Sequence, residues 1–450
     1  MKKLFILCIA ATMFACKQDP KIDYALFSGK IENPTDKTVI VFDGREKVKE
    51  MVLSENGTFA DTLKIESGYY TLRHGKESST IYLDPENDID MTLNTKSFDE
   101  TLKYSGKGSE NNNYLAAKFL ADEKSNIDYA KTFALDEADF LKAVNDIKNS
   151  KQELLNNAKN ISDQFRALEQ KNTEYEYLAN LQNYKSYHHY YAKKAMYKPS
   201  EDFNKIINNV DYNNAEDYAI LGSYKRLALS HYSNKIGDSD NPKEVFEDIN
   251  QNTFPALKDD LAKKMIYEIS PNNEHNEAYY NGLMALSSDE DFKNQLTTKF
   301  NTVNKLSKGK PSPKFTDYEN HKGGTTSLDD LMGKYVYIDV WATWCGPCIR
   351  EIPSLKEVEK QFHNKNIEFV SVSIDNDAAH DKWVTMVKEK ELGGIQLIAD
   401  NDWNSKFVKD YAIQGIPRFI LIDPEGKIVN ADAPRPSDPK LVELFIELKI

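Results

Sequence analysis

The stretch Trp341-Ala342-Thr343-Trp344-Cys345-Gly346-Pro347-Cys348 joins an apolar segment, 335–341, to a segment with helical periodicity, 348–363. A cysteine at the start of a helix lies beside unpaired backbone N–H groups and the positive end of the helix dipole, which stabilise a thiolate. Gly346 allows a tight turn and Pro347 fits the first helical turn, so both sulfurs come within disulfide distance. The stretch predicts a redox-active pair in which Cys345 attacks and Cys348 faces inward as the resolving thiol.

Two cysteines at this spacing can also be half of a zinc site, or a structural disulfide. The chain has no second pair of this kind, and its eight histidines show no ligand spacing such as His-x₃-His, which disfavours zinc. A disulfide that closes so short a loop stabilises little, because the gain grows with loop length. Redox chemistry is the favoured interpretation, and both alternatives stay open at this point.

The segments around the pair alternate between strand and helix. Strands are expected at 335–341, 367–374, 418–422 and 427–430, and helices at 348–363, 380–390, 403–411 and from 439 to the end. Such alternation is typical of an α/β domain. It follows the polar Pro/Gly stretch 307–313, which we interpret as a linker, so the α/β domain is assigned to 314–450.

The middle of the chain, 109–306, is predicted to be a helical domain. Leu154, Ala158, Ile161, Phe165 and Leu168 recur at steps of three and four residues, which predicts one face of a helix. Further helical stretches are expected at 215–230, 242–249, 254–269 and 289–306.

Residues 24–108 are predicted to form a β-sandwich-like domain. Short segments that often alternate between apolar and polar residues are separated by turn-forming residues such as Asn33-Pro34 and Glu55-Asn56-Gly57. Strands at this spacing indicate an antiparallel sandwich or open barrel. The predicted fold class is therefore multidomain, with an N-terminal antiparallel β domain, a central α-helical region and a C-terminal α/β domain.

The N-terminus has the layout of a secretory signal peptide. Two lysines precede an apolar run, 4–11, which falls short of the roughly 20 residues that a membrane-spanning helix needs. Met13-Phe14-Ala15-Cys16 resembles a bacterial lipobox, so 1–15 is predicted to be a lipoprotein signal peptide, Cys16 the lipidated residue and 16–23 a tether. Ordinary cleavage that leaves Cys16 as a stray thiol is the alternative. The mature protein is expected in the cell envelope, anchored outside the cytoplasm on the periplasmic face or in the outer membrane.

Composition narrows the function further. The chain has 450 residues, enough for two to four domains at roughly 100–200 residues each. A net charge of −13 without a basic block disfavours a nucleic-acid partner. Cysteines stand only at positions 8, 16, 345 and 348, which excludes a dense disulfide framework. The acidic loop residues Asp375, Asp377, Asp400 and Asp402 lack EF-hand spacing, and we predict neither a metal nor a cofactor.

Residues 311–450 resemble the thioredoxin superfamily, and more narrowly its membrane-anchored thiol–disulfide oxidoreductases of the ResA/TlpA type. The resemblance rests on WATWCGPC and on Gly415-Ile416-Pro417 just before strand 418–422. It implies a thioredoxin-like fold, a redox-active disulfide between Cys345 and Cys348, and a cis peptide bond at Pro417 beside that disulfide. The residues expected on the substrate-binding side are Trp344, Gly346, Pro347, Ile416 and Pro417.

Two acids bear on proton transfer. Asp339 interrupts the apolar segment 335–341, where a buried carboxylate is costly unless it is paired or neutral. By resemblance it matches the buried Asp of thioredoxins, which exchanges protons with the resolving cysteine. Ser371 stands where that family has a lysine partner, so we expect a raised pKa for Asp339. Glu351 matches the Glu of the ResA/TlpA motif and is expected either to do similar work or to be an exposed helix acid.

These features predict an extracytoplasmic, lipid-anchored thiol–disulfide oxidoreductase that reduces protein disulfides. The family implies a membrane electron donor, and Gly-Pro between the cysteines resembles reducing thioredoxins. One alternative is a redox-sensitive binding or scaffold lipoprotein that works through 24–306. A thiol peroxidase is a further alternative, disfavoured because the Pro-x₃-Thr/Ser-x₂-Cys setting of peroxiredoxins is absent around Cys345.

Overall fold

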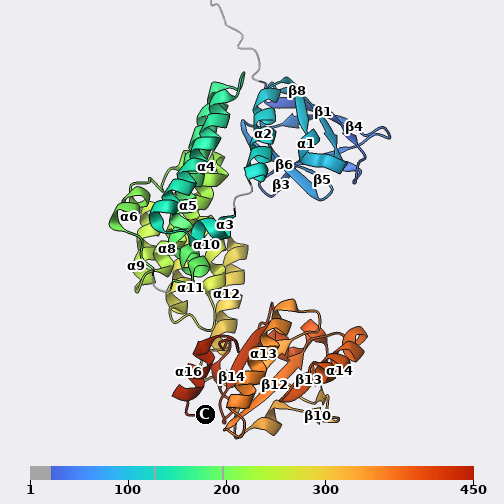
Figure 1. The fold of residues 1–450 in the computed structure, drawn as a ribbon, viewed down its shortest axis with the longest axis vertical. Coiled ribbons are helices and arrows are strands. Elements are labelled where there is room, and N and C mark those ends of the chain that lie inside the picture. The colour runs from blue at the N-terminus through green and yellow to red at the C-terminus, as the bar shows by residue number, and fades with distance from the viewer. Residues whose placement is uncertain (1–21, 126–127, 195–196) are drawn as a thin grey trace, which may run out of the picture. The chain divides into compact units, whose positions relative to one another are not determined.

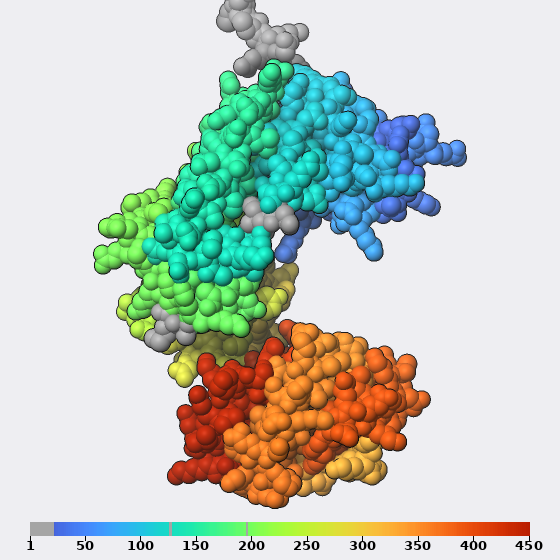
Figure 2. All heavy atoms as spheres, viewed as in Figure 1, coloured from blue at the N-terminus to red at the C-terminus, as the bar shows by residue number. Residues whose placement is uncertain are grey.

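The computed structural model describes residues 22–125, 128–194 and 197–450. The chain divides into two compact units, Met1–His231 and Tyr232–Ile450. Figure 1 shows the strands and helices of both, and Figure 2 shows the same chain as space-filling atoms. The division falls inside the predicted helical domain, and the predicted domain boundaries stay predictions. The predicted signal peptide and Cys16 lie outside the described residues.

The first unit contains two four-stranded β-sheets whose inner faces share one core. Their strand orders are β4-β1-β7-β8 and β3-β2-β5-β6. Alternate residues are buried along β1, where Ala25, Phe27 and Ile31 enter the core beside Val39 and Leu72 of the other sheet. The strands are β1 (Tyr24–Glu32), β2 (Thr38–Asp43), β3 (Glu46–Val52), β4 (Thr58–Lys64), β5 (Gly68–His74), β6 (Glu77–Leu83), β7 (Asp88–Asn94) and β8 (Lys103–Lys107).

The prediction of a purely antiparallel β domain is wrong for one pair of strands. β1 and β7 run parallel, with Leu26 opposite Asp88 and Glu32 opposite Asn94. A parallel pair needs a long connection between its strands, and here the chain passes through the other sheet before it returns. Alternation of apolar and polar residues places side chains on faces but does not determine the direction of the neighbouring strand.

The helices of the first unit follow and interleave with these sheets. Asn112 of α2 ties its helix to β6, since its side-chain amide pairs with the N–H and C=O of Tyr82 at 2.7 and 2.9 Å. The helices are α1 (Phe98–Thr101), α2 (Ser109–Ser125), α3 (Tyr129–Ala134), α4 (Glu137–Asn157), α5 (Asp163–Ala192), α6 (Glu201–Asn208), α7 (Ala215–Ile220) and α8 (Gly222–Gly237), whose end lies in the second unit, with a short 3₁₀ turn η1 (Thr95–Ser97).

One helix predicted across 154–168 is in fact two. α4 ends at Asn157 and α5 begins at Asp163. Asn160 has a left-handed φ of 59°, and the side chain of Ser162 caps α5 by accepting a hydrogen bond from the N–H of Phe165. The periodic apolar side chains still share one cluster with Tyr82 and Tyr114, because they pack across the break.

The second unit, from Tyr232, contains the end of α8, then a set of helices packed on one another, and then the α/β domain. Gly282 of α11 lies against the ring of Phe246 in α9, where an added Cβ would come within 2.2 Å of the ring. The helices of this part are α9 (Pro242–Asn252), α10 (Pro255–Met265), η2 (Ile266–Glu268), α11 (Asn276–Leu286) and α12 (Glu290–Lys305). No helix of the described residues is long and apolar enough to cross a membrane.

A seven-stranded sheet forms the centre of the α/β domain, with strand order β10-β9-β13-β12-β11-β14-β15. β11, β12 and β13 are parallel, while β14 and β15 are antiparallel to their neighbours. The elements are β9 (Tyr318–Asn320), β10 (Thr325–Thr326), η3 (Leu328–Leu331), β11 (Tyr335–Trp341), α13 (Gly346–Gln361), β12 (Ile367–Ser373), η4 (Asp377–Ala379), α14 (His380–Glu389), β13 (Ile395–Ile398), η5 (Asp402–Asn404), α15 (Lys406–Asp410), β14 (Arg418–Ile422), β15 (Ile428–Asn430) and α16 (Pro439–Glu447).

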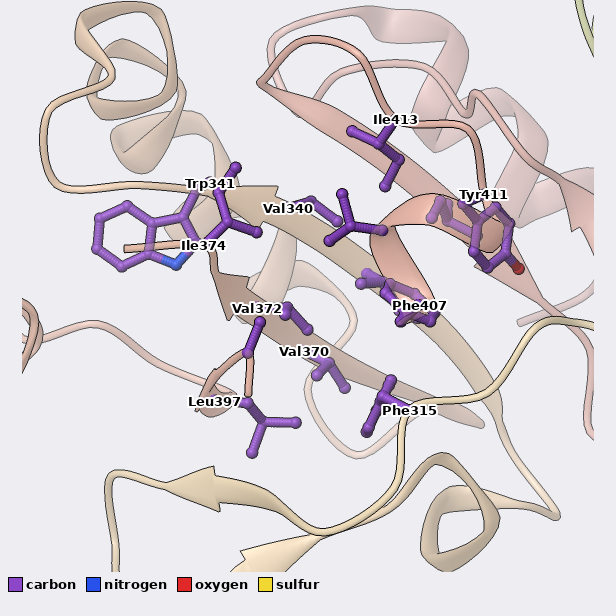
Figure 3. Close-up of a cluster of buried hydrophobic side chains, with 14 of the residues drawn as sticks. Phe315, Val340, Trp341, Val370, Val372, Ile374, Leu397, Phe407, Tyr411 and Ile413 are labelled. Atoms are coloured by element: carbon purple, nitrogen blue, oxygen red, sulfur yellow. The ribbon is translucent and has the colours of Figure 1, made fainter. Parts of the chain in front are cut away.

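Helices cover both faces of this sheet. Val340, Val370 and Val372 point to one face, where they pack with Phe315 and Phe407 (Figure 3). On the other face, side chains of α13 and α16 pack on Tyr337, Phe369 and Phe419. Because side chains alternate along a strand, Asp339 belongs to the face of Tyr337 and is covered by α13.

Candidate active site

The two cysteines form a disulfide at the junction between β11 and α13. The sulfurs are 2.00 Å apart and the Cα atoms 5.3 Å apart. Cys345 has an extended backbone and caps the helix, since its Sγ accepts a hydrogen bond from the N–H of Cys348 at 3.2 Å. Pro347 lies in the first turn, where a missing N–H costs nothing. Each cysteine is only 4% exposed, so the pair sits at the edge of the core rather than on an open surface.

Asp375 holds the loop that leads into the pair. Its buried carboxylate accepts hydrogen bonds from the N–H and the hydroxyl of Thr343, both at 2.8 Å, and from the hydroxyl of Ser373 at 2.7 Å. Sequence reasoning placed Asp375 among acidic loop residues and missed this role. The one signal for this contact was the position of Asp375 just after the predicted strand 367–374. Parallel neighbouring strands end at the same edge of a sheet, so residues that follow them can meet there.

The segment before β14 lies on the other side of the disulfide. The peptide bond between Ile416 and Pro417 is cis, as the resemblance implied. The carbonyl oxygen of Ile416 is 3.8 Å from Sγ of Cys345. The structure thus brings Ile416 and Pro417 to the redox pair from about seventy residues further along the chain.

An aromatic pair borders the disulfide. Trp344 is 55% exposed, and its ring centroid lies 6.3 Å from that of Trp403 in η5. Trp341, by contrast, is buried in the core (Figure 3). Sequence reasoning singled out Trp344 but not Trp403, whose proximity depends on how the segment after β13 folds back.

Asp339 lies beneath the pair, in the middle of β11. It stands opposite Ser371 of β12 and Phe419 of β14. Its Oδ1 atom is buried and has no hydrogen-bond partner among the described residues. Burial, followed by the negative charges of Glu351 and Glu359, raises the pKa of Asp339 to about 8, while a hydrogen bond with Ser371 opposes the rise. The raised pKa agrees with the sequence-based expectation.

Asp339 and Cys348 line the same small cavity, of about 10 Å³, between α13 and the sheet. A cavity of this size accommodates about one water molecule. The second cysteine and the buried acid therefore share a space in which one water can carry a proton between them.

Glu351 is partly buried and is held by the loop before α16. Its two carboxylate oxygens accept hydrogen bonds from the N–H and the hydroxyl of Ser437, at 3.0 and 2.9 Å. Its negative charge contributes to the raised pKa of Asp339. The described residues contain no group of three or more His, Cys, Asp or Glu side chains arranged to hold a metal ion.

Comparisons with known proteins agree with this arrangement. The Redoxin family model matches residues 307–443. The thiol-disulfide oxidoreductase ResA of Bacillus thuringiensis (strain Al Hakam) is 32% identical over 129 residues, which cover 28% of this chain and 69% of the relative. ResA of Bacillus subtilis (strain 168) is 30% identical over 125 residues, or 28% of this chain and 66% of the relative.

Among solved structures, the thioredoxin domain of a thiol-disulfide oxidoreductase from Bacteroides vulgatus is 31% identical to this chain. It matches 32% of this chain and 98% of its own, with a TM-score of 0.29. The ResA relatives and the Redoxin match cover the region that carries the cysteine pair. The chain therefore belongs to the ResA/TlpA-type thiol-disulfide oxidoreductases of the thioredoxin superfamily, and it is a thioredoxin-like enzyme.

Proposed function

We propose that the enzyme reduces disulfides in proteins outside the cytoplasm, with Cys345 as the attacking and Cys348 as the resolving cysteine. The observation that carries this proposal is the position of Cys345 as the cap of α13, where its sulfur accepts the N–H of Cys348. The same helix N-terminus stabilises a thiolate once the disulfide is reduced. Thiolate attack on a substrate disulfide then yields a mixed disulfide, which Cys348 resolves.

In this proposal the acids beneath the pair handle the proton of Cys348. Asp339 accepts it, because it lines the same cavity and its pKa of about 8 lies close to that of an ordinary thiol. Glu351 acts through Asp339, since its charge makes ionisation of that buried carboxyl more costly.

The substrate is proposed to lie across the disulfide as an extended segment. Ile416 offers its backbone beside Cys345 and Pro417 follows it, while Gly346 and Pro347 form the first turn of α13 below. Trp344 contributes an exposed apolar ring at the rim. Extended peptides commonly gain affinity through backbone hydrogen bonds of this kind.

We further propose that Cys16 carries a lipid anchor after removal of 1–15, and that a membrane donor supplies electrons. The lipobox-like sequence supports the anchor. Residues 24–108 and 109–306 are proposed as separate domains that determine specificity, with 307–313 as the linker to the redox domain 314–450.

The reduction potential of the Cys345–Cys348 pair tests the proposed direction. We expect a value near that of thioredoxin, about −270 mV, measured by equilibration of the full chain with a thiol redox buffer. A value near about −120 mV indicates an oxidant and contradicts the proposal. Cys345→Ala and Cys348→Ala variants are expected to lose reduction of a protein disulfide while they retain the folded structure by circular dichroism.

A further inference from the structure

A buried proton acceptor needs a route to solvent. Asp339 is 9% exposed, and its Oδ1 atom has no partner among the described residues. Each catalytic cycle places a proton on this group and then has to remove it. The small cavity that Asp339 shares with Cys348 is therefore only the inner part of any proton path.

Glu359 lies where this path can continue. It lines the small cavity together with Asp339 and Cys348. It also lines a surface hollow of about 640 Å³ at the C-terminal end of α13, beside β12 and the Gly393-Gly394 turn. Glu359 is thus in contact with both the buried space and the solvent-facing space, two helical turns after Glu351.

The Glu359 carboxylate is not held by a fixed partner. Within residues 22–125, 128–194 and 197–450 no hydrogen bond or ion pair engages it, unlike Glu351 with Ser437. It lies against the Gly393-Gly394 turn, where a Cβ added to Gly393 would be 2.3 Å from its Oε2. The absence of a side chain at Gly393 leaves the space that the carboxylate occupies.

We propose that Glu359 is a proton-relay residue, whose carboxyl passes protons between the cavity of Asp339 and Cys348 and the solvent. This inference rests on the proposed roles of these two residues. Glu359 acts through Asp339 and does not touch the reacting sulfurs.

The step that Glu359 serves is the resolution of the mixed disulfide. The thiol of Cys348 gives its proton to Asp339, and its sulfur attacks the sulfur of Cys345. The Cys345–Cys348 bond forms, the bond from Cys345 to the substrate breaks, and the substrate leaves as a thiolate that takes a proton from solvent. The cysteine pair loses two electrons and the substrate disulfide gains them. The proton on Asp339 then moves to Glu359 and on to solvent.

The electrostatics of Glu359 agree with this role. Burial raises the pKa of Glu359 to about 7, and the charge of Lys356 opposes the rise. A carboxyl that titrates near neutral pH can both accept and release protons there. The inner side presents Asp339 and Cys348. The charged and titratable groups that line the outer hollow are Lys356 and Lys360 of α13, His363 and Lys365 after it, Lys334 before β11, Glu368 of β12 and Glu391 after α14.

The test uses the reduced full-length protein and dithiobis-nitrobenzoate, a disulfide that releases a coloured thiolate. The first release reports attack by Cys345, and the second reports resolution by Cys348. In Glu359→Gln we expect an unchanged first phase and a second phase slowed about tenfold near neutral pH in dilute buffer. A high concentration of imidazole buffer is expected to restore the second phase, because a small acid–base pair can replace the relay. Glu357→Gln, an exposed acid of the same helix, is the matched control and should leave both phases unchanged.

Two further variants leave the residue Glu359 itself unchanged. Gly393→Ala displaces the Glu359 carboxylate and should slow the second phase several-fold, with the same rescue by buffer. Lys356→Met removes the charge that lowers the pKa of Glu359, so the pH profile of the second phase should move to higher pH. These variants test the relay even if Glu359→Gln does not fold.

The outcomes separate this inference from the proposed function. A second phase of normal rate in Glu359→Gln and Gly393→Ala, or a slow phase that buffer does not restore, overturns the relay. If Asp339→Asn also leaves the second phase unchanged, the proton role of Asp339 is wrong as well. A second release that persists in Cys348→Ser contradicts the assignment of the resolving cysteine.

Discussion

Asp339 is a carboxylic acid whose ionisation the fold opposes. Two neighbouring strands cover it on either side, and α13 covers its face of the sheet. The neighbouring strand offers the Asp339 carboxylate only the hydroxyl of Ser371, and not a positively charged side chain. Desolvation is therefore the largest influence on the pKa of Asp339. At the residue scale the active site therefore combines a nucleophile that is stabilised as an anion with a buried acid whose pKa is raised to about 8, where it can both accept and release a proton.

The stability of the protein should depend on pH through Asp339. The folded protein binds this proton more tightly than the unfolded chain, because the pKa rises from 3.8 to about 8. The favourable contribution is complete below pH 3.8 and is lost as the pH rises toward about 8. Asp339→Asn removes this dependence, so the variant should gain at most about 6 kcal/mol relative to wild type at alkaline pH. Urea unfolding at a series of pH values measures the free energy of unfolding of both proteins. If this free energy depended on pH with the same slope in wild type and variant, the prediction would be wrong.

Glu351 should affect the same titration from a distance. Its charge raises the pKa of Asp339, so Glu351→Gln is expected to lower that pKa. The measurement is the pH at which the fall in stability levels off in the variant, with Glu357→Gln as the exposed control. The same upper limit in variant and wild type would mean that Glu351 serves only to hold Ser437.

At the scale of elements, contacts between strand ends hold the redox pair in position. The carboxylate of Asp375, after β12, fixes Thr343, after β11. The cap of α13 follows directly, so the orientation of Cys345 depends on a loop from the neighbouring strand.

Asp375→Ala should therefore lower both stability and activity. It leaves the buried N–H and hydroxyl of Thr343 without their acceptor, which costs about 2–4 kcal/mol. The rate of attack by Cys345 should also fall, because its orientation depends on the Thr343 loop that Asp375 holds. Urea unfolding and the first release of coloured thiolate measure the two effects. The control is Asp377→Ala, an exposed acid two residues further on, and a similar loss in both variants would refute a specific role for Asp375.

Helix packing in the second unit depends on Gly282. A methyl group there meets the ring of Phe246, so Gly282→Ala should destabilise this unit by about 1–3 kcal/mol. Gly237→Ala is the matched control, because no atom lies within 4 Å of its added Cβ. Thermal unfolding compares the two, and equal midpoints would show that α9 and α11 adjust without cost.

At the scale of the whole molecule, the redox domain takes up less than a third of the chain. The rest consists of a two-sheet β domain and helices in two compact units. The sequence has four cysteines, at positions 8, 16, 345 and 348. Residues 17–344 therefore contain no cysteine that could exchange with the active site.

The proposed lipid anchor at Cys16 should determine whether the whole protein is bound to the membrane. Cys16→Ser should move the protein from the membrane fraction to the soluble fraction of cells, because a lipid chain contributes about 0.8 kcal/mol for each buried methylene. Fractionation followed by immunoblotting measures this, with Cys345→Ser as a control that stays in the membrane fraction. A Cys16→Ser protein that remains membrane-bound would contradict lipidation at this residue.

Much of the redox domain was predictable because its signals are local. The apolar segment before Cys345 and the periodicity after Cys348 predict β11 and α13, and 418–422 matches β14. β13 was not predicted, since four residues carry too little periodicity to distinguish a strand. The break between α4 and α5 was also missed, because a helical spacing of apolar residues persists across the loop.

The sequence by itself determined the chemistry of this protein, because the two cysteines, the cap and the first helical turn are neighbours along the chain. Only the tertiary structure decided which distant groups surround them. Asp375, Trp403 and Glu359 are brought to the site from other elements, and the parallel pairing of β1 with β7 depends on the path through a second sheet. Local patterns specify the face on which a side chain lies, whereas its partners depend on how the faces pack together.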